Sequence, residues 1–133
     1  MLFAIAAPFT TDWYQQRYAM IIITDIKQAL HQAQTEAMTS GKTVRLVPCV
    51  GCTRWSQGMA LISEQTSDIF YEWRWPKSTC TVSWHGFIAD HYLRFSPDLR
   101  HAALNGYFTI HSAHQSGWKL MVNRLGYSRM VVI

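Results

Sequence analysis

The longest regular pattern in the chain is an apolar stripe at helical spacing across residues 11–40. Apolar side chains recur every three or four positions, as on one face of an α-helix. They are Ile22, Ile23, Ile26, Leu30, Ala33 and Ala37. Polar residues fill the opposite side, and Gly41 stands where a left-handed cap commonly ends a helix. We predict one amphipathic helix from Thr11 to Ser40, packed through its stripe against a sheet.

The first nine residues, MLFAIAAPF, are all apolar. They are too few to cross a bilayer, which takes about 20 apolar residues in a helix. No basic residue precedes Leu2, so the stretch lacks the pattern of a signal peptide. Pro8 would either kink a helix that continues from residues 1–7 or lie in the first turn of a helix that starts there.

After Gly41 the pattern changes to short apolar and β-branched runs separated by turn residues. The predicted strands cover residues 43–47, 56–63, 69–75, 79–84, 91–96, 106–112, 118–123 and 127–133. Strand follows strand with no helix between them, which excludes an alternating α/β fold. The predicted fold class is α+β, with a long N-terminal helix laid on an antiparallel, several-stranded sheet.

Length, composition and charge narrow the class of protein. A chain of 133 residues forms one domain with a real core, and 49% hydrophobic residues exclude a disordered chain. Six Trp, six Tyr and six Phe favour a β-rich body. The net charge of +4 permits an anionic partner but does not require one.

Three cysteines give an odd count, with Cys49 and Cys52 in PCVGC and Cys80 apart from them. A Cys49–Cys52 disulfide would suit an oxidising compartment, and two free thiols are the alternative. A redox role needs the pair at the start of a helix, where the thiol pKa falls. Here Pro48 precedes the pair and both flanks read as strand, so redox catalysis is not predicted.

Histidines in the C-terminal half are the other candidate for chemistry. Closely spaced pairs of Cys or His are typical of structural zinc sites, and such a pair occurs only in CVGC. The histidines are therefore interpreted as surface or loop residues, and no metal or cofactor is expected. No Gly-x-Ser-x-Gly elbow is present, and serines near histidine are what chance gives, so we predict no enzyme. The residues weighed are His85, His91, His101, His111, His114, Asp90, Asp98, Ser83 and Ser96.

The ordered motifs DIKQALHQAQTEAMTSGKTVRL, WSQGMALI, WHGF, LRFSPD, NGYFTI and KLMVNRLGYSRM cover nearly the whole chain. In this order they resemble the GspH/FimT family of type IV minor pilins and type II secretion pseudopilins. The cysteine loop followed by Trp55 and Gly58 looks more like the FimT-type minor pilins. The resemblance implies a pilin-like fold.

The resemblance also implies an organisation. Residues 1–9 would be the C-terminal remnant of the hydrophobic pilin helix, residues 10–41 the amphipathic helix, and residues 42–133 the β-rich head. Family members begin with a leader and a Phe-Thr-Leu-Ile-Glu-like start. Neither stands in this sequence, so we expect a truncated chain or a misassigned start.

The implied function is that of a structural subunit. Such a subunit would be anchored in the bacterial inner membrane by its N-terminal helix, with a periplasmic head. It would prime filament assembly with other minor pilins and the major pilin. The alternative within the family is a type II secretion pseudopilin, and outside it a periplasmic ligand-binding module.

Some FimT members bind DNA through a basic Gly-Arg-x-Arg ending, which corresponds to residues 126–129. Arg129 keeps the second arginine, whereas Tyr127 replaces the first. Lys119 and Arg124 would add charge, as could Arg94 or Arg100, and Tyr127 could stack on an unpaired base. The alternative is that these are ordinary solvated side chains on a terminal strand.

Overall fold

The structure is a computed structural model of the chain. It describes residues 2–75, 80–87, 91–98, 104–111, 117–123 and 127–132, with side chains from Arg17 onward. Arg124, Arg100, His101, His114 and Asp90 lie outside the described residues.

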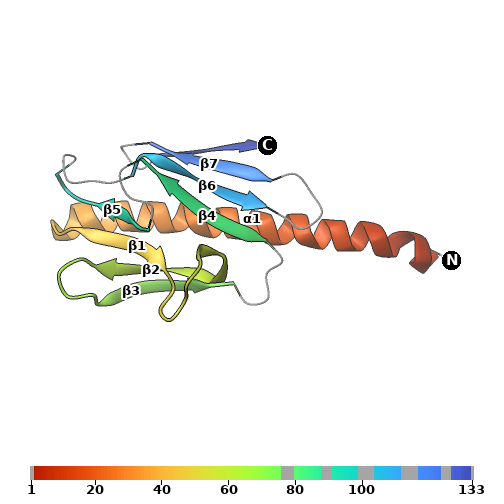
Figure 1. Cartoon of the computed structure of the whole chain (residues 1–133), viewed down its shortest axis with the longest axis horizontal. Helices are drawn as coiled ribbons and strands as arrows, with labels where there is room; N and C mark the ends of the chain where they lie inside the picture. Colours follow the sequence, from red (N-terminus) through yellow and green to blue (C-terminus); the bar gives the residue numbers. More distant parts are fainter. Residues whose placement is uncertain are drawn as a thin grey trace.

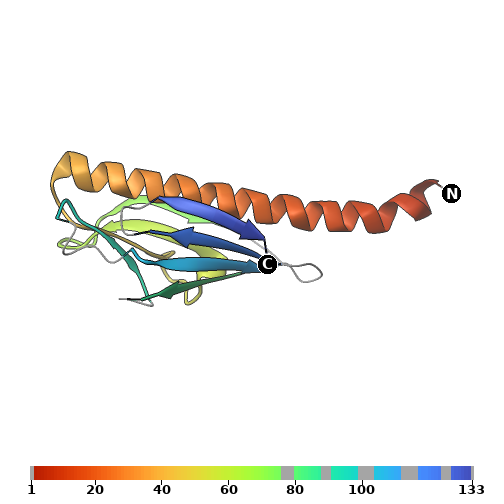
Figure 2. The same cartoon turned by 90° about the horizontal axis from the view of Figure 1, so that it is seen from above.

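Helix α1 runs from Leu2 to Ser40 without a break. Its N-terminal part extends well beyond the strands (Figures 1 and 2). The helix therefore begins nine residues before the predicted Thr11, and Pro8 lies inside it. A proline in a helix removes one backbone hydrogen bond. Within the described residues, no helix is both long and apolar enough to be a candidate membrane span.

The predicted apolar stripe is the buried face of α1. Ile22, Ile26 and Ala33 are 0–1% exposed, and the rest of the stripe is buried with them. Gly41 follows with a φ of 70°, and its N–H donates to the carbonyl of Ala37 at 3.0 Å. This is the predicted left-handed cap, and it ends the helix where expected.

Two four-stranded antiparallel sheets make up the head, in place of the single sheet expected from the sequence (Figure 1). The first has the order β3-β2-β1-β5 and the second β4-β6-β7-β8. The first contains β1 (Val44–Pro48), β2 (Gly58–Ser63), β3 (Ile69–Arg74) and β5 (Leu93–Phe95), and the second β4 (Thr81–Gly86), β6 (Gly106–His111), β7 (Trp118–Val122) and β8 (Ser128–Val132). The α+β class is confirmed, and all eight predicted strands are present. β1 and β4 keep the predicted length but are shifted by one and two residues, and the other six are shorter than predicted.

The sheets separate because β5 returns to pair with β1, whereas β4 pairs with β6. Hydrophobic alternation identifies a strand but not its partner, so the sequence pattern could not reveal this split. A single-turn 3-10 helix, η1 (Trp55–Gln57), also replaces the predicted start of the strand at residue 56. Gly58 then begins β2 with a φ of 144°, a conformation that favours glycine.

One continuous core joins α1 to both sheets. It contains Leu46 and Phe95 from the first sheet, Phe108 and Leu120 from the second, and the stripe of α1. The Phe108 ring lies 4.7 Å from the Trp84 ring and 5.5 Å from the Trp55 ring, measured between centroids. Figure 2 shows the helix lying along one side of the strands.

A hydrogen bond inside this core ties the first sheet to the helix. The indole Nε1 of Trp75, directly after β3, donates to Asp25 Oδ2 at 2.8 Å. Trp75 is 8% exposed, and its backbone N–H donates to the carbonyl of Gln57 at 3.1 Å. The polar residue Asp25 therefore has a specific partner on the packed side of α1.

Asp25→Ala should lower the free energy of unfolding by about 1–3 kcal/mol, because it leaves the buried indole N–H without its acceptor. Asp25→Asn keeps a hydrogen-bond acceptor and should lower the free energy of unfolding by less. Glu36→Ala, at a position of the same helix that is half-buried like Asp25, is the matched control. Urea denaturation followed by tryptophan fluorescence measures all three, and equal stability of Asp25→Ala and Glu36→Ala would contradict the assignment.

Candidate nucleic-acid interface and assembly surfaces

The strand register brings Lys119 and Arg129 to one face of the second sheet. Met121 on β7 lies opposite Arg129 on β8, and Lys119 lies opposite Val131. Alternate residues of a strand point to opposite faces. Trp118, Leu120 and Val122 are buried on the other face, so Lys119, Met121 and Arg129 face outward. Two of the four residues proposed for DNA contact therefore share a surface.

Tyr127 and Arg129 also line a common groove at one end of this sheet. The groove has a volume of about 460 Å³, and Phe87, Met121 and Asn123 line it with them. Tyr127 is 72% exposed and Phe87 is 83% exposed. Phe87 was not among the predicted site residues, although an apolar residue directly after a strand and a glycine, in WHGF, indicates an exposed side chain.

The outward face of the second sheet is basic and aromatic. The ammonium group of Lys119 lies 4.5 Å from the centroid of the Tyr107 ring, a cation–π contact. The same ring stacks on His85 at 5.0 Å with an interplanar angle of 25°. Strands β4, β6, β7 and β8 contain no Asp or Glu. This face therefore suits an anionic ligand.

Arg94 does not join this interface, because it belongs to the first sheet. Its Nε lies 2.8 Å from Glu64 Oε1, and Arg45 Nη2 reaches the same oxygen at 2.8 Å. Both guanidinium groups also lie over the Tyr92 ring, at 5.3 Å for Arg94 and 4.4 Å for Arg45. The two charges are engaged within this cluster, so the idea that Arg94 adds charge near Arg129 is wrong.

The cysteine loop is a closed turn at the end of β1. Cys49 and Cys52 are joined by a disulfide with a Cα–Cα distance of 5.1 Å, and Cys52 N donates to the Cys49 carbonyl. Glu72 on β3 accepts hydrogen bonds from Arg74 Nε at 2.7 Å and from Val50 N at 3.2 Å. The Arg74 guanidinium and this backbone N–H lower the pKa of Glu72. These contacts attach the loop to the first sheet.

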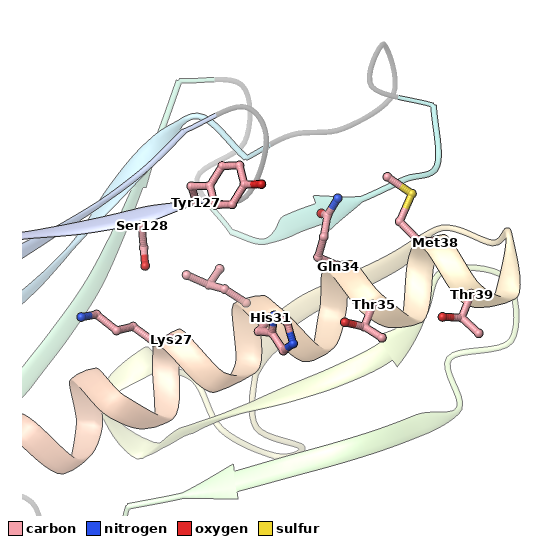
Figure 3. A pocket seen from close by; sticks show the side chains of 9 residues that line it. Lys27, His31, Gln34, Thr35, Met38, Thr39, Tyr127 and Ser128 are labelled. Carbon is pink, nitrogen blue, oxygen red and sulfur yellow. The ribbon is translucent and has the colours of Figure 1, made fainter.

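A second groove, of about 600 Å³, lies between α1 and the start of β8 (Figure 3). Lys27, His31 and Gln34 line it from the helix, and Tyr127 and Ser128 line it from the opposite side. Figure 3 shows Tyr127 above the helix, so the ring stands between the two grooves. No described group here forms a nucleophile–base pair, and the groove offers no catalytic arrangement.

The histidines that the structure describes do not meet in one place. His85 and His111 lie on different strands, β4 and β6, opposite Tyr107 and Thr81 respectively. Among the residues that the structure describes, no group of three His, Cys, Asp or Glu side chains could hold a metal ion.

Comparison with known proteins addresses the fold and the family. A family model described as type II transport protein GspH matches residues 23–126. Two solved structures of the type IV minor pilin FimU from Pseudomonas aeruginosa strain PAO1 share the fold at 16% identity. The P21 form gives a TM-score of 0.61 and covers 95% of this chain and 92% of that chain. The P65 form gives a TM-score of 0.56 and covers 87% of this chain and 91% of that chain. No curated protein matches the chain.

Thiol counting tests the state of the three cysteines. Cys80 is 3% exposed, so alkylation of the folded chain without reductant should leave it unlabelled. Unfolding without reductant should add one label, and unfolding with reductant three, as read by intact mass. Cys80→Ala is the control and should take no label without reductant. Three labels on the unreduced wild type would exclude the Cys49–Cys52 bond.

Proposed function

This chain belongs to the family of the type II transport protein GspH, and we propose that it is a minor pilin of a type IV pilus. The observation that carries the proposal is the N-terminal part of α1, which extends beyond the head (Figure 1). Its residues 2–9 are apolar without exception. A helical segment of this kind has no function in an isolated soluble head, but it can pack against other apolar helices.

Filament assembly would use the two parts of α1 differently. The projecting part would pack among the helices of neighbouring subunits, where apolar helices exchange lipid contacts for protein contacts of similar polarity. The part from Ala19 to Ala37 is buried against the subunit's own head and connects the head to the projecting part. The proposed role is therefore structural, with no reaction catalysed and no cofactor.

The proposed partners follow from this role. Before assembly the subunit would be held in the bacterial inner membrane through its N-terminal helix, with the head in the periplasm. It would then assemble with other minor pilins and the major pilin, and prime filament growth. The alternative is a type II secretion pseudopilin, which the description of the matching family supports, whereas the similarity to FimU supports the pilus.

Deleting the gene in its native host separates the two roles. We expect fewer surface pili, counted by electron microscopy, and unchanged secretion of extracellular enzymes. The wild-type gene should restore piliation, whereas Ile5→Asp should not, because a carboxylate in the apolar segment opposes helix packing. Gln28→Glu, at an exposed site of the same helix, is the control and should restore it. Normal pili with lost secretion would favour the pseudopilin.

A second function, DNA binding, is supported by the outward face of the second sheet. Lys119 and Arg129 share that face, Tyr127 lines the adjoining groove, and the four strands carry no acidic residue. Arg124 lies in the same C-terminal segment. Each phosphate that these cations neutralise would release roughly one counterion, so binding would weaken steeply with salt.

Gel shifts at low salt test this second function. Arg129→Ala, Arg124→Ala and Lys119→Ala should each weaken the complex with DNA and reduce the slope of log affinity against log salt by about 1. Lys42→Ala, an exposed lysine just after α1, is the matched control and should bind as the wild type does. If the wild type shifts no DNA at low salt, the DNA-binding role is excluded.

A further inference from the structure

We propose that the outward face of the second sheet binds single-stranded DNA in preference to duplex, with unpaired bases stacked on Phe87 and Tyr127. The inference rests on the DNA-binding role proposed above and specifies its ligand. It also moves the centre of the site from the C-terminal ending to a groove lined by β6, β7 and β8 and by Phe87, directly after β4.

The two most exposed aromatic side chains among the described residues line one groove. Phe87 is 83% exposed and Tyr127 is 72% exposed. The groove that they line has a volume of about 460 Å³. Pockets of a few hundred Å³ are typical of small-ligand sites. Exposure of a large apolar ring to water is energetically unfavourable and often marks a binding site. Two such rings in one groove suit a ligand with flat apolar faces.

Backbone hydrogen bonds hold both aromatic residues in place. The N–H of Phe87 donates to the carbonyl of Asn105 at 2.9 Å. The N–H of Tyr127 donates to Asn123 Oδ1 at 3.0 Å, and Asn123 N donates back to the Tyr127 carbonyl at 2.9 Å. The rings therefore stand on a fixed backbone, so less conformational entropy is lost when a base stacks on them.

A row of side chains leads from the groove across the sheet. His85, Tyr107, Met121 and Arg129 are successive register partners on β4, β6, β7 and β8. Three gaps of about 4.8 Å separate the four strands, which gives a track long enough for more than one nucleotide. Lys119 adds an ammonium group to this track, where its contact with the Tyr107 ring holds it.

The charge of this face is too small for duplex binding to dominate. In the described part of the outward face, the permanent cations are Lys119 and Arg129. Duplex binding depends mainly on phosphate neutralisation, and duplex bases are hidden in their own stack. Unpaired bases expose both faces, and each base stacked on an aromatic ring typically raises affinity by about tenfold or more. Aromatic contacts therefore favour the single strand.

Fluorescence anisotropy with the full chain tests this preference. The probes are a short labelled oligothymidine and a labelled duplex of equal length, at low and at physiological salt. We expect the single strand to bind at least about tenfold more tightly than the duplex, because only the single strand gains the stacking contacts. Unlabelled heparin, an anionic polymer without bases, should displace it poorly at physiological salt.

Variants separate stacking from charge. Phe87→Ala and Tyr127→Ala should each weaken single-strand binding about tenfold and duplex binding by a much smaller factor, whereas Tyr127→Trp should retain single-strand binding. Arg129→Gln should weaken both ligands and lower the salt slope by about 1. Phe70→Ala and Tyr71→Ala remove exposed aromatic rings from β3, in the other sheet, and are the matched controls. Circular dichroism and thermal unfolding confirm that each variant is folded.

Two results would overturn the inference. One is duplex binding as tight as single-strand binding, and the other is unchanged single-strand affinity in both Phe87→Ala and Tyr127→Ala. Either result would leave the broader DNA-binding role standing, with binding carried by charge alone. Absence of binding to both probes would remove the broader role as well.

Discussion

The whole molecule depends on the burial of one apolar stripe of α1 against two sheets at once. Neither sheet pairs with the other through backbone hydrogen bonds, so their connection runs through side chains and the helix. The helix contacts β1 and β5 of the first sheet and β6 of the second. Removing α1 would expose the inner faces of both sheets, which makes the helix an integral part of the head as well as its support.

The second sheet serves two purposes because successive residues of a strand alternate between its faces. On β7, Trp118 and Leu120 complete the core, while Lys119 and Met121 face outward. The core thus fixes the spacing of the outward residues on the surface. The first sheet uses its outward arginines differently, since Arg45 and Arg94 both pair with Glu64. Glu64 therefore offsets part of the positive charge on that side.

Local patterns in the sequence were sufficient for the helix face, its end at Gly41 and the strands, because these depend on neighbouring residues. Strand partners were not predictable, since β1 pairs with β5 across 45 residues of chain and nothing local encodes that choice. Lys119 and Arg129 could be proposed from charge and alternation, with a family resemblance as guide. The motif WHGF could indicate an apolar residue exposed after a strand, but not that Phe87 lines the same groove as Tyr127, because this depends on the order of the four strands in the second sheet.

The continuity of α1 from Leu2 to Ser40 has a mechanical consequence for a subunit held in a filament by its N-terminal segment. Tension would act along the helix axis. A load applied at the head would reach the helix through the apolar stripe and the Trp75–Asp25 hydrogen bond. Many side chains would share that load in shear, while the strands themselves would bear little of it. The outward face of the second sheet would keep its shape while the filament is under strain.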